Sequence, residues 1–507
     1  MLAPRGEGQT PVHIYVEQGR SPGQAMPGKA ILAPDQEMIR YAITDGAIHS
    51  LLHEEDPRLQ NFRLCNACGS CTPYCPARIN DSGANGDPGY LARRVTAALQ
   101  AGRSPGLDLD DCVQCYSCET VCPRSVSIGG IINAVYETEH LQPVFRRMLL
   151  DRGGLPPRAF LPLYTERGHF HKFIAKAVRY PYPVDGRAID EVRRLLLRPV
   201  DASAFSVPGH RPPRRLLARP DRVFHLNSCC AFNYPGADLS QKMILAALGI
   251  RYETSAMQTC CGGAPHYMGG AGFADRLLLT ARNLSVIRDA FEPGGEIAVT
   301  GICPTCSDSY AAALDMLSRS PNREVVNAAL ARIGREVTDP EAFVVANILD
   351  LYPLYLDELR RLVKRRLTGL AVGVHVSCHY RKMNGTLAVP PGLLDLTAVT
   401  GARITRSVME HYCCGGVKNL FDRHRKSRPL ELSRLNRLVR QDFMNNRLDV
   451  MVVDCPGCEL VYDHMGVPVL HITELLALAM GADPRETVCI QGHLTSLSPA
   501  LDRIGIL

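Results

Sequence analysis

The sequence has 507 residues but no run of 18 or more apolar ones, so we expect no membrane-spanning helix. It also lacks lysine and arginine tracts with interleaved aromatic residues, and its net charge of +6 is small for this length. Nothing therefore favours nucleic-acid binding. No Gly-x-Gly-x-x-Gly sequence follows a predicted strand, which argues against a dinucleotide bound by this chain. Tryptophan is absent, and we attach no functional meaning to that.

What the sequence contains in quantity is cysteine, with 20 residues. Disulfide frameworks are typical of short secreted chains, whereas this chain is long enough for two to four domains. Its first 30 residues are rich in glycine and proline and have no apolar core, unlike a signal peptide. We therefore expect a cytoplasmic protein whose thiols bind metal.

Two copies of one short cysteine pattern occur in the first quarter of the chain. They are Cys65-x2-Cys68-x2-Cys71-x3-Cys75-Pro76 and Cys112-x2-Cys115-x2-Cys118-x3-Cys122-Pro123. This spacing is typical of bacterial ferredoxins with two [4Fe-4S] clusters. The close triple places three sulfurs on one loop, and the fourth cysteine reaches the other cluster.

The pattern assigns ligands to two cubane clusters. We expect one cluster on Cys65, Cys68, Cys71 and Cys122, and the other on Cys112, Cys115, Cys118 and Cys75. A pair of zinc sites is the alternative, but zinc prefers two Cys-x-x-Cys knuckles to three thiols at successive x2 spacing.

The N-terminal part of the chain divides into three regions. Residues 1–56 form an extension, and residues 57–145 an all-helical ferredoxin module, with helices expected over 87–100 and 128–140. Residues 146–220 form a junction rich in arginine and proline. We expect this junction to be a solvated linker, with a docking surface for an acidic partner as the alternative.

The rest of the chain alternates strands with helices, which predicts an α/β fold with parallel sheets. We divide it into two equivalent domains, residues 221–345 and 346–507. The predicted strands are 222–227, 296–302, 372–376 and 450–453. Helices are expected around Leu277, Leu284 and Ile287, around Leu435, Val439 and Phe443, and over 475–480 with Thr473 as the cap.

A five-cysteine series occurs once in each of these domains, and its first and fourth cysteines each follow the end of a predicted strand. The first copy is Cys229, Cys260-Cys261-Gly262-Gly263 and Cys303-Pro304-Thr305-Cys306, and the second is Cys378, Cys413-Cys414-Gly415-Gly416 and Cys455-Pro456-Gly457-Cys458. The gaps are 30 and 41 residues in the first copy and 34 and 40 in the second. This repetition predicts two equivalent metal centres in a duplicated domain. The paired glycines would let the backbone pass close to a bulky cluster.

Spacing alone leaves the kind of centre open, because five sulfurs exceed the four that a cubane uses. Each set is a cubane with one spare thiol, a zinc site with redox cysteines, or a non-cubane cluster.

From about residue 57, the junction excepted, the chain resembles heterodisulfide reductase, with the iron–sulfur C subunit of that enzyme fused ahead of its catalytic B subunit. Three segments carry the resemblance: residues 229–236, 367–380 and 468–481. It implies that each cysteine-rich CCG domain holds a non-cubane [4Fe-4S] cluster on five cysteines. The implied ligands are Cys229, Cys260, Cys261, Cys303 and Cys306 for one cluster and Cys378, Cys413, Cys414, Cys455 and Cys458 for the other. Cys230 is an extra thiol, and its neighbour Cys229 is favoured by its distance from Asn233.

The activity implied by the resemblance is that of a disulfide oxidoreductase working as one component of a complex. The disulfide would split between the two centres, each sulfur being captured by an open iron, while the ferredoxin clusters supply single electrons. The same site would serve disulfide formation. The implied electron partner is a flavin-containing subunit or a membrane cytochrome, through which the protein would associate with a membrane. The disulfide is the coenzyme M–coenzyme B heterodisulfide, a lipoyl-type disulfide or another small disulfide.

Polar residues near the cysteines are candidates for supplying protons. We single out His379, His266 and Lys418 as catalytic candidates, with His411 nearby, although each such residue also suits a structural role. The family's usual glycine-rich run is shortened here to Cys-Cys-Gly-Gly-Val-Lys, ending at Lys418. We expect the strand histidines His225, His375 and His471 to lie in the core, and Cys489 to be a buried apolar thiol.

Two other functions compete with catalysis. Related cysteine-rich domains resemble iron–sulfur subunits of glycolate, lactate or quinone-linked complexes, in which the centres would only relay electrons. Such subunits often have incomplete cysteine sets, and both sets are complete here, which favours catalysis. A zinc-binding scaffold is the third option, and a colourless protein without iron would support it.

Overall fold

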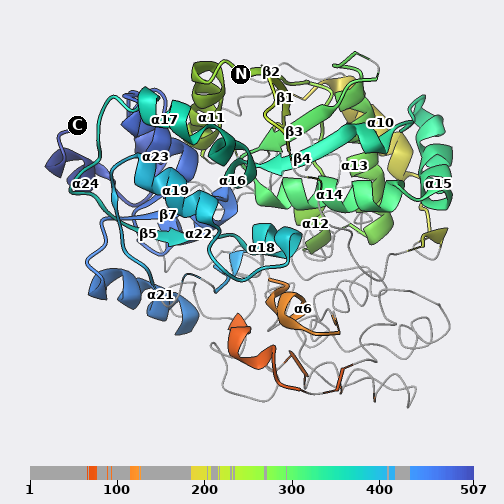
Figure 1. Ribbon diagram of the computed structural model, residues 1–507. Helices are drawn as coiled ribbons and strands as arrows, with labels where there is room; N and C mark the ends of the chain where they lie inside the picture. The colour runs from red at the N-terminus through yellow and green to blue at the C-terminus, as the bar shows by residue number, and fades with distance from the viewer. Residues whose placement is uncertain are drawn as a thin grey trace, which may run out of the picture.

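The protein has the expected α/β architecture, seen in a computed structural model (Figure 1). The structure describes residues 65–66, 68–76, 88–89, 93, 97, 115–124, 126, 184–201, 204–206, 215, 217–228, 231, 234–267, 271–292, 294–407, 410, 412–416 and 434–507. Two four-stranded parallel sheets form its centre. No helix among these residues is long and apolar enough to cross a membrane.

The first sheet has the strand order β2-β1-β3-β4. Its strands are β1 (Arg222–His225), β2 (Arg251–Glu253), β3 (Ile297–Gly301) and β4 (Phe343–Asn347). Every residue of the central strand β3 and of the edge strand β4 is buried, as expected for a parallel sheet covered on both faces.

The second sheet repeats this order as β6-β5-β7-β8. Its strands are β5 (Ala371–His375), β6 (Arg403–Ile404), β7 (Val450–Val453) and β8 (Val469–His471). All pairings in both sheets are parallel. The predicted duplication of an α/β domain is therefore confirmed.

The four strands predicted from the sequence correspond to β1, β3, β5 and β7. They are the two central strands of each sheet. The other four strands were not predicted. β2, β6 and β8 are only two or three residues long, which is too short for a recognisable pattern. β4 continues the first sheet to Asn347, two residues past the boundary that we expected at residue 345.

Helices connect the strands and cover the sheets. In the first repeat they are α11 (Pro235–Ala247), α12 (Gly263–Tyr267), α13 (Phe273–Arg288), α14 (Pro304–Leu317), α15 (Ser320–Leu330) and α16 (Ile348–Leu351). In the second they are α17 (Leu356–Leu362), α18 (Cys378–Asn384), α19 (Pro391–Val399), α21 (Arg434–Asn445), α22 (Pro456–His464), α23 (Ile472–Ala479) and α24 (Ser498–Arg503). The helices predicted around Leu277 and Val439 are α13 and α21.

One hydrophobic core joins the two repeats. It contains Val223 of β1 and Ile244 of α11 from the first repeat, together with Val372 of β5 and Leu475 of α23 from the second. α11 packs directly on α23. Because apolar burial stabilises by roughly 25 cal/mol per Å², this shared core holds the two sheets in a fixed relation.

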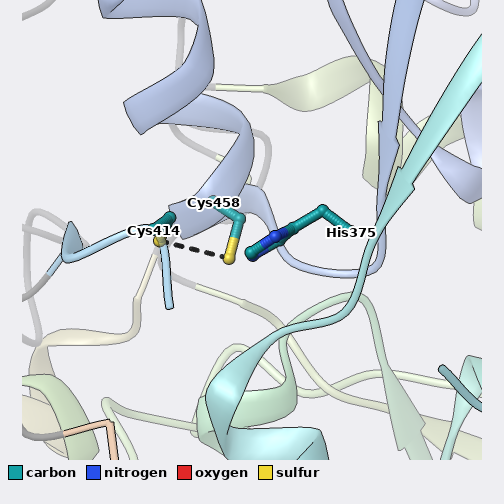
Figure 2. Close-up of side chains that lie close together, drawn as sticks. All are labelled: His375, Cys414 and Cys458. Atoms are coloured by element: carbon teal, nitrogen blue, oxygen red, sulfur yellow. Dashed lines mark hydrogen bonds between the residues drawn. The ribbon is translucent and has the colours of Figure 1, made fainter. Parts of the chain in front are cut away.

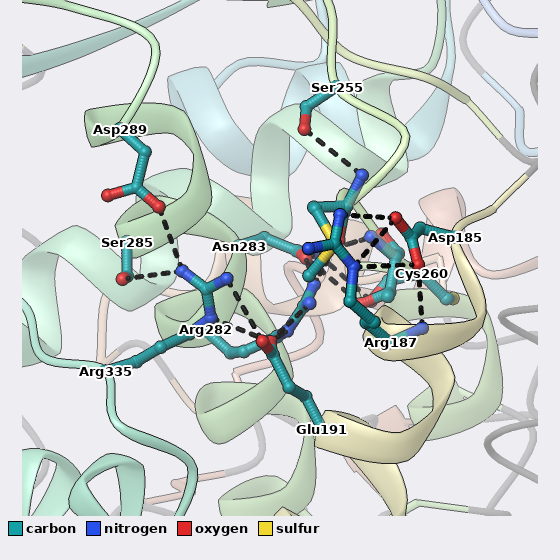
Figure 3. Close-up of polar contacts among 12 residues, drawn as sticks. Asp185, Arg187, Glu191, Ser255, Cys260, Arg282, Asn283, Ser285, Asp289 and Arg335 are labelled. Carbon is teal, nitrogen blue, oxygen red and sulfur yellow. Dashed lines mark hydrogen bonds and ion pairs between the residues drawn. The ribbon is translucent and has the colours of Figure 1, made fainter.

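Part of the junction is packed, which contradicts the expectation of a solvated linker. Residues Gly186–Leu196 form helix α10, whose buried face includes Ile189, Val192 and Leu195. Glu191 of this helix accepts hydrogen bonds from Arg282 Nη2 (2.6 Å) and Arg335 Nε (2.7 Å), as Figure 3 shows. Arg193 and Arg194 of the pattern lie on the exposed face of this amphipathic helix.

The ferredoxin module is described only in part. The 3-10 helix η2 (Thr72–Tyr74) and helix α6 (Ser117–Val121) belong to its two cysteine loops. Residues 88, 89, 93 and 97 are helical, in agreement with the helix expected over 87–100. The helix over 128–140 and the extension 1–56 lie outside the described residues, so an all-helical module remains a prediction.

Substituting Gly236 tests the shared core. A Cβ atom on this α11 residue would lie 1.9 Å from the carbonyl oxygen of Val488 and 2.5 Å from Glu474 Oε1. We expect Gly236→Ala to lower the free energy of unfolding by about 1–3 kcal/mol, the usual cost of overpacking. The measurement is the denaturant midpoint of the purified protein. Gly186→Ala is the control, since nothing lies within 4 Å of its Cβ position, and equal midpoints for the two variants would contradict this account.

Candidate functional site

Each Cys-x-x-Cys motif begins a helix directly after a central strand. Cys303 is the N-cap of α14 and Cys455 the N-cap of α22, and each is followed by a proline in the first turn. Proline suits this position because its missing N–H would be unbonded there anyway. The sulfurs thus gather at the C-terminal edge of each sheet, beside the positive end of a helix dipole, which favours thiolates.

The five cysteines of the second set are brought together. Cys378, Cys413, Cys414, Cys455 and Cys458 are all buried. The Sγ atoms of Cys414 and Cys458 lie 3.4 Å apart. Cys413 hydrogen-bonds with Cys378 and with Cys414, and Cys458 with Cys455. Hydrogen bonds with Cys413 and Cys458 hold the pKa of the Cys414 thiol well below its usual value.

The first set is described for four of its five members. Cys260, Cys261, Cys303 and Cys306 are buried, and the Sγ atoms of Cys261 and Cys306 lie 3.6 Å apart. Hydrogen bonds from Cys260 and Cys306 lower the pKa of the Cys261 thiol. Cys229 and Cys230 lie outside the described residues, so the choice between them stays a prediction.

The first glycine of each Cys-Cys-Gly-Gly turn adopts a left-handed conformation. Gly262 has a φ of 74° and Gly415 a φ of 73°, values that side chains with a Cβ rarely adopt. In this conformation the N–H of Gly262 points to Cys260 Sγ (3.4 Å) and that of Gly415 to Cys413 Sγ (3.3 Å). The glycines therefore direct backbone donors at the sulfurs.

Different side chains hold the two turns. In the first repeat, Asn283 of α13 donates to the carbonyl oxygens of Thr259 (2.8 Å) and Cys260 (3.3 Å) (Figure 3). In the second, Arg381 of α18 donates through Nη2 to the carbonyl oxygens of Glu410 (2.8 Å) and Tyr412 (3.5 Å), which lead into the turn. Both side chains are buried, so each turn is fixed from the interior.

The ferredoxin module contacts the second set. Cys115 packs against Cys378 and Cys413 in one buried cluster. A hydrogen bond with Cys413, together with burial, raises the pKa of the Cys115 thiol well above its usual value. Helix α6, which follows Cys115, packs on α18, the helix that begins at Cys378 (Figure 1).

A pocket in the ferredoxin module is lined by cysteines from both of its loops. They are Cys65, Cys68, Cys71, Cys118 and Cys122. Four of these five are the ligands predicted for the first cubane, including Cys122 from the other loop. Cys112 lies outside the described residues, so the second ligand set is only partly visible.

His379 lies between the two cysteine sets. Its Nδ1 atom is 3.5 Å from Cys378 Sγ and 3.3 Å from Thr305 Oγ1, and Thr305 stands between Cys303 and Cys306 of the first set. Burial lowers the pKa of His379 to about 4, so the imidazole is neutral near pH 7. This candidate is thus in contact with both sets.

A buried group of charged and aromatic side chains surrounds His379. Asp308 accepts hydrogen bonds from Tyr267 Oη (2.6 Å), Arg276 Nη2 (3.1 Å) and Lys382 Nζ (3.2 Å). The ring of Tyr267 lies 4.6 Å from that of His379. We did not predict these residues; their only signal in the sequence is that Asp308 and Lys382 follow ligand cysteines by two and four positions.

The ferredoxin module reaches the same group through Tyr116. The ammonium of Lys382 lies 4.0 Å from the centroid of the Tyr116 ring, a cation–π geometry. Tyr116 also packs edge-on against Tyr267, at 5.7 Å between centroids. All three parts of the chain therefore meet between the cysteine sets.

Of the other two catalytic candidates, the structure describes only His266. His266 is buried on α12, where Nδ1 lies 3.1 Å from the carbonyl oxygen of Ala271 and the ring packs on Tyr267. Lys418 lies outside the described residues, as does His411.

The strand histidines are buried as expected, but they make specific contacts. A ring nitrogen of His375 lies within 4.8 Å of the sulfurs of both Cys414 and Cys458 (Figure 2). His225, in the equivalent place in the first repeat, instead pairs with Asp238 at 2.7 Å.

Two smaller expectations were wrong. Thr473 does not cap α23; the N-cap is His471. Its Nδ1 accepts from Thr473, and its Nε2 lies 3.2 Å from the carbonyl oxygen of Ile302. Cys489 is not fully buried but half-exposed, and partial burial raises its pKa to about 11.

A carboxyl pair lies beside the second set. Glu459 and Glu474 are fully buried beside each other, and ligand atoms of both carboxyls and of His493 lie within 4.8 Å of one another. Burial raises the pKa of Glu474 to about 8. Glu474 also accepts a hydrogen bond from the backbone N–H of His471 at 2.9 Å. Near neutral pH the folded protein therefore holds a proton on this pair that the unfolded chain would release.

This proton predicts a pH dependence of stability. A carboxyl group whose pKa is raised on folding makes its full contribution to the stability of the folded state when the pH is below its unfolded pKa. This contribution is lost as the pH rises to the folded pKa. We expect the thermal midpoint to fall between about pH 4.5 and 8, the unfolded and folded pKa values of this carboxyl, and Glu474→Gln to flatten this fall. Glu486→Gln, at an exposed position, is the control; an unchanged slope in Glu474→Gln would refute the assignment.

Comparison with known proteins agrees with this arrangement. A family model described as a 4Fe-4S dicluster domain matches residues 64–127. A second, described as a cysteine-rich domain, matches twice, over residues 223–309 and 372–462. The two later matches begin in β1 and β5 and end beyond the two Cys-x-x-Cys motifs, so each covers one cysteine set.

Three curated relatives illustrate the similarity. The B subunit of the ferredoxin:CoB-CoM heterodisulfide reductase of Methanosarcina acetivorans is 26% identical over 317 residues, covering 57% of this chain and 98% of that protein. The glycolate oxidase iron-sulfur subunit of Escherichia coli is 26% identical over 368 residues, covering 70% and 79%. An iron-sulfur C subunit of the CoB–CoM heterodisulfide reductase of Methanocaldococcus jannaschii is 35% identical over 80 residues, covering 15% and 39%. The chain therefore carries a 4Fe-4S dicluster domain followed by paired cysteine-rich domains, and it is similar to the C and B subunits of heterodisulfide reductases.

Proposed function

We propose that this chain is the catalytic component of a cytoplasmic complex that cleaves or forms a small disulfide between its two five-cysteine sets. The observation that supports this most is the position of His379, whose Nδ1 atom touches both Cys378 and Thr305. A relay would not need a titratable side chain in that place. The overall change is one disulfide, two electrons and two protons giving two thiols.

The donor atoms suit iron–sulfur clusters. Each set consists of buried cysteines alone, and thiolates are the ligands that such clusters take. The first set, completed by Cys229, and the second set would each hold a non-cubane [4Fe-4S] cluster, and the two ferredoxin loops would hold two cubanes. When bound, these groups supply electrons singly.

The residues between the sets suit thiolate products. Arg276 and Lys382 both pair with the buried carboxylate of Asp308, so two basic side chains lie in the group next to His379. A buried positive charge stabilises a nearby anion more than it would in water. We assign His379 the role of hydrogen-bonding a substrate sulfur, with Tyr267 and Lys382 as the proton-bearing groups behind it.

The remaining candidates have lesser parts in this proposal. His266 packs on Tyr267 and would orient that ring without touching substrate. Lys418 follows the second glycine turn in the sequence and is proposed to line the substrate entrance.

Electrons would enter at the second set. Cys115 of the ferredoxin loop packs directly on Cys378 and Cys413, which gives the closest approach of that module to either cysteine series among the described contacts. The external donor is proposed to be a flavin-containing subunit or a membrane cytochrome.

An electron relay is the second candidate function. It is favoured by the similarity to the glycolate oxidase iron-sulfur subunit, which covers 70% of this chain. The four described cysteines of the first set and all five of the second are buried together, and this completeness leads us to prefer catalysis.

Paramagnetic resonance distinguishes the two functions. We expect the anaerobically purified, oxidised protein to give a new EPR signal from the duplicated centres when a small thiol is added, because a substrate sulfur binds there. Iron and sulfide are counted in the same sample. Intact clusters without a thiol-dependent signal would favour the relay.

Cysteine substitution tests the ligand assignment. Cys413 lies at the centre of the second set, so we expect Cys413→Ser to lose about four iron atoms per chain, the content of one [4Fe-4S] cluster. Cys489→Ser is the matched control, because the described hydrogen bonds of this thiol go to backbone oxygens. Equal iron contents in the two variants would remove Cys413 from the ligands.

A further inference from the structure

Each cysteine set has a buried tyrosine one helical turn after its Cys-x-x-Cys motif. Tyr310 follows Cys306 by four residues on α14, and Tyr462 follows Cys458 by four on α22. Residues four apart lie on the same face of a helix, so both rings are carried beside the sulfurs. The pKa of each phenol is raised by burial and by the adjacent thiols.

A histidine ends the central strand of each sheet, and here the repeats differ. In the second repeat, the Tyr462 hydroxyl and His375 Nδ1 are hydrogen-bonded at 3.0 Å. In the first, His225 Nε2 is bonded to Asp238 at 2.7 Å, and a salt bridge joins Asp238 to Lys242. Tyr462 thus has an imidazole partner that Tyr310 lacks among the described contacts.

Counting hydrogens shows that the Tyr462–His375 pair has a donor to spare. A neutral imidazole carries one N–H and a phenol one O–H, and their mutual bond uses one of the two. If Tyr462 donates, the N–H is at His375 Nε2, which has no partner within the described structure. If His375 donates, the Tyr462 hydroxyl hydrogen is left instead.

The pair lies beside the sulfurs of the second set. A ring nitrogen of His375 lies within 4.8 Å of the sulfurs of Cys414 and Cys458, and Figure 2 shows the ring beside Cys458. The imidazole is 1% exposed and the phenol 2%, so water does not satisfy the donor. Buried donors are nearly always bonded, and a sulfur acceptor is what this side of the pair offers.

We infer that the Tyr462–His375 pair donates a hydrogen bond to a sulfur of the second centre and makes that centre easier to reduce than the first. The inference rests on the proposed function, in that the set holds a cluster. Hydrogen bonds to cluster sulfurs stabilise the more negative, reduced form and so raise the reduction potential. The two centres have equivalent ligands but would then differ in reduction potential. The centre with the higher reduction potential would be the second one, which lies next to Cys115.

The test is a redox titration of the intact holoprotein followed by EPR. We expect Tyr462→Phe and His375→Gln each to shift the midpoint potential of the second centre to a more negative value. The double variant should shift no further than the larger single change, because the two residues act as one donor. Tyr310→Phe is the matched control and should leave the second centre unchanged.

A second readout separates hydrogen bonding from packing. The second centre of the wild-type protein should show an exchangeable proton coupling by electron–nuclear double resonance. The coupling should be lost in deuterium oxide, and lost or weakened in Tyr462→Phe or in His375→Gln, depending on which residue carries the spare hydrogen. The iron content of every variant is measured. If Tyr462→Phe has lost iron, its potential no longer reports on the hydrogen bond, and the result for His375→Gln is used instead.

The outcomes of this test are distinct. Unchanged midpoints with the proton coupling retained would overturn the inference while leaving the proposed function intact. A wild-type protein without signals from the duplicated centres would overturn the proposed function itself.

Discussion

The hydrophobic core shared by the two repeats is the interaction on which the rest of the structure depends. Each sheet presents its cysteines at the C-terminal ends of its strands, but a sheet alone does not fix where the other set lies. The packing of α11 on α23 does so, and hydrogen bonds cross the same boundary. Thr473 donates to the carbonyl oxygen of Ala237 at 2.9 Å, and His471 contacts that of Ile302, the residue before Cys303.

Fixing the two sets in this way creates a small polar region that neither repeat contains alone. Asp308 and Tyr267 come from the first repeat, His379 and Lys382 from the second, and Tyr116 from the ferredoxin module. Burying such groups is costly unless they are bonded to one another. The region therefore depends on correct docking of all three parts, which ties the geometry of the site to the assembly of the fold.

The duplication is complete in strand order but not in side chains. The first glycine turn is held by an asparagine and the second by an arginine, while the equivalent strand histidines face a carboxylate in one repeat and sulfurs in the other. Equal ligand patterns therefore sit in unequal surroundings. For a reaction that moves two electrons in single steps, unequal surroundings give the two centres separate roles.

The sequence by itself determined the elements that short-range chemistry controls. Cysteine spacing gave both ferredoxin loops and both five-cysteine series, and the burial pattern gave the central strands, because each signal lies within a few residues. Short edge strands such as β6 contain too few residues for a strand pattern to be recognised. Helix α10 was not predicted because the arginines on its exposed face were taken as a sign of a solvated linker. Tertiary structure alone decided that His379 touches both sets, that Cys115 docks on Cys413, and that His375 faces sulfur. The contacts of His379 with Thr305 and of Cys115 with Cys413 join residues 74 and 298 positions apart in the sequence. The contact of His375 depends on which side of the strand end faces the cysteines. Only the packing of the repeats and the ferredoxin module selects these contacts.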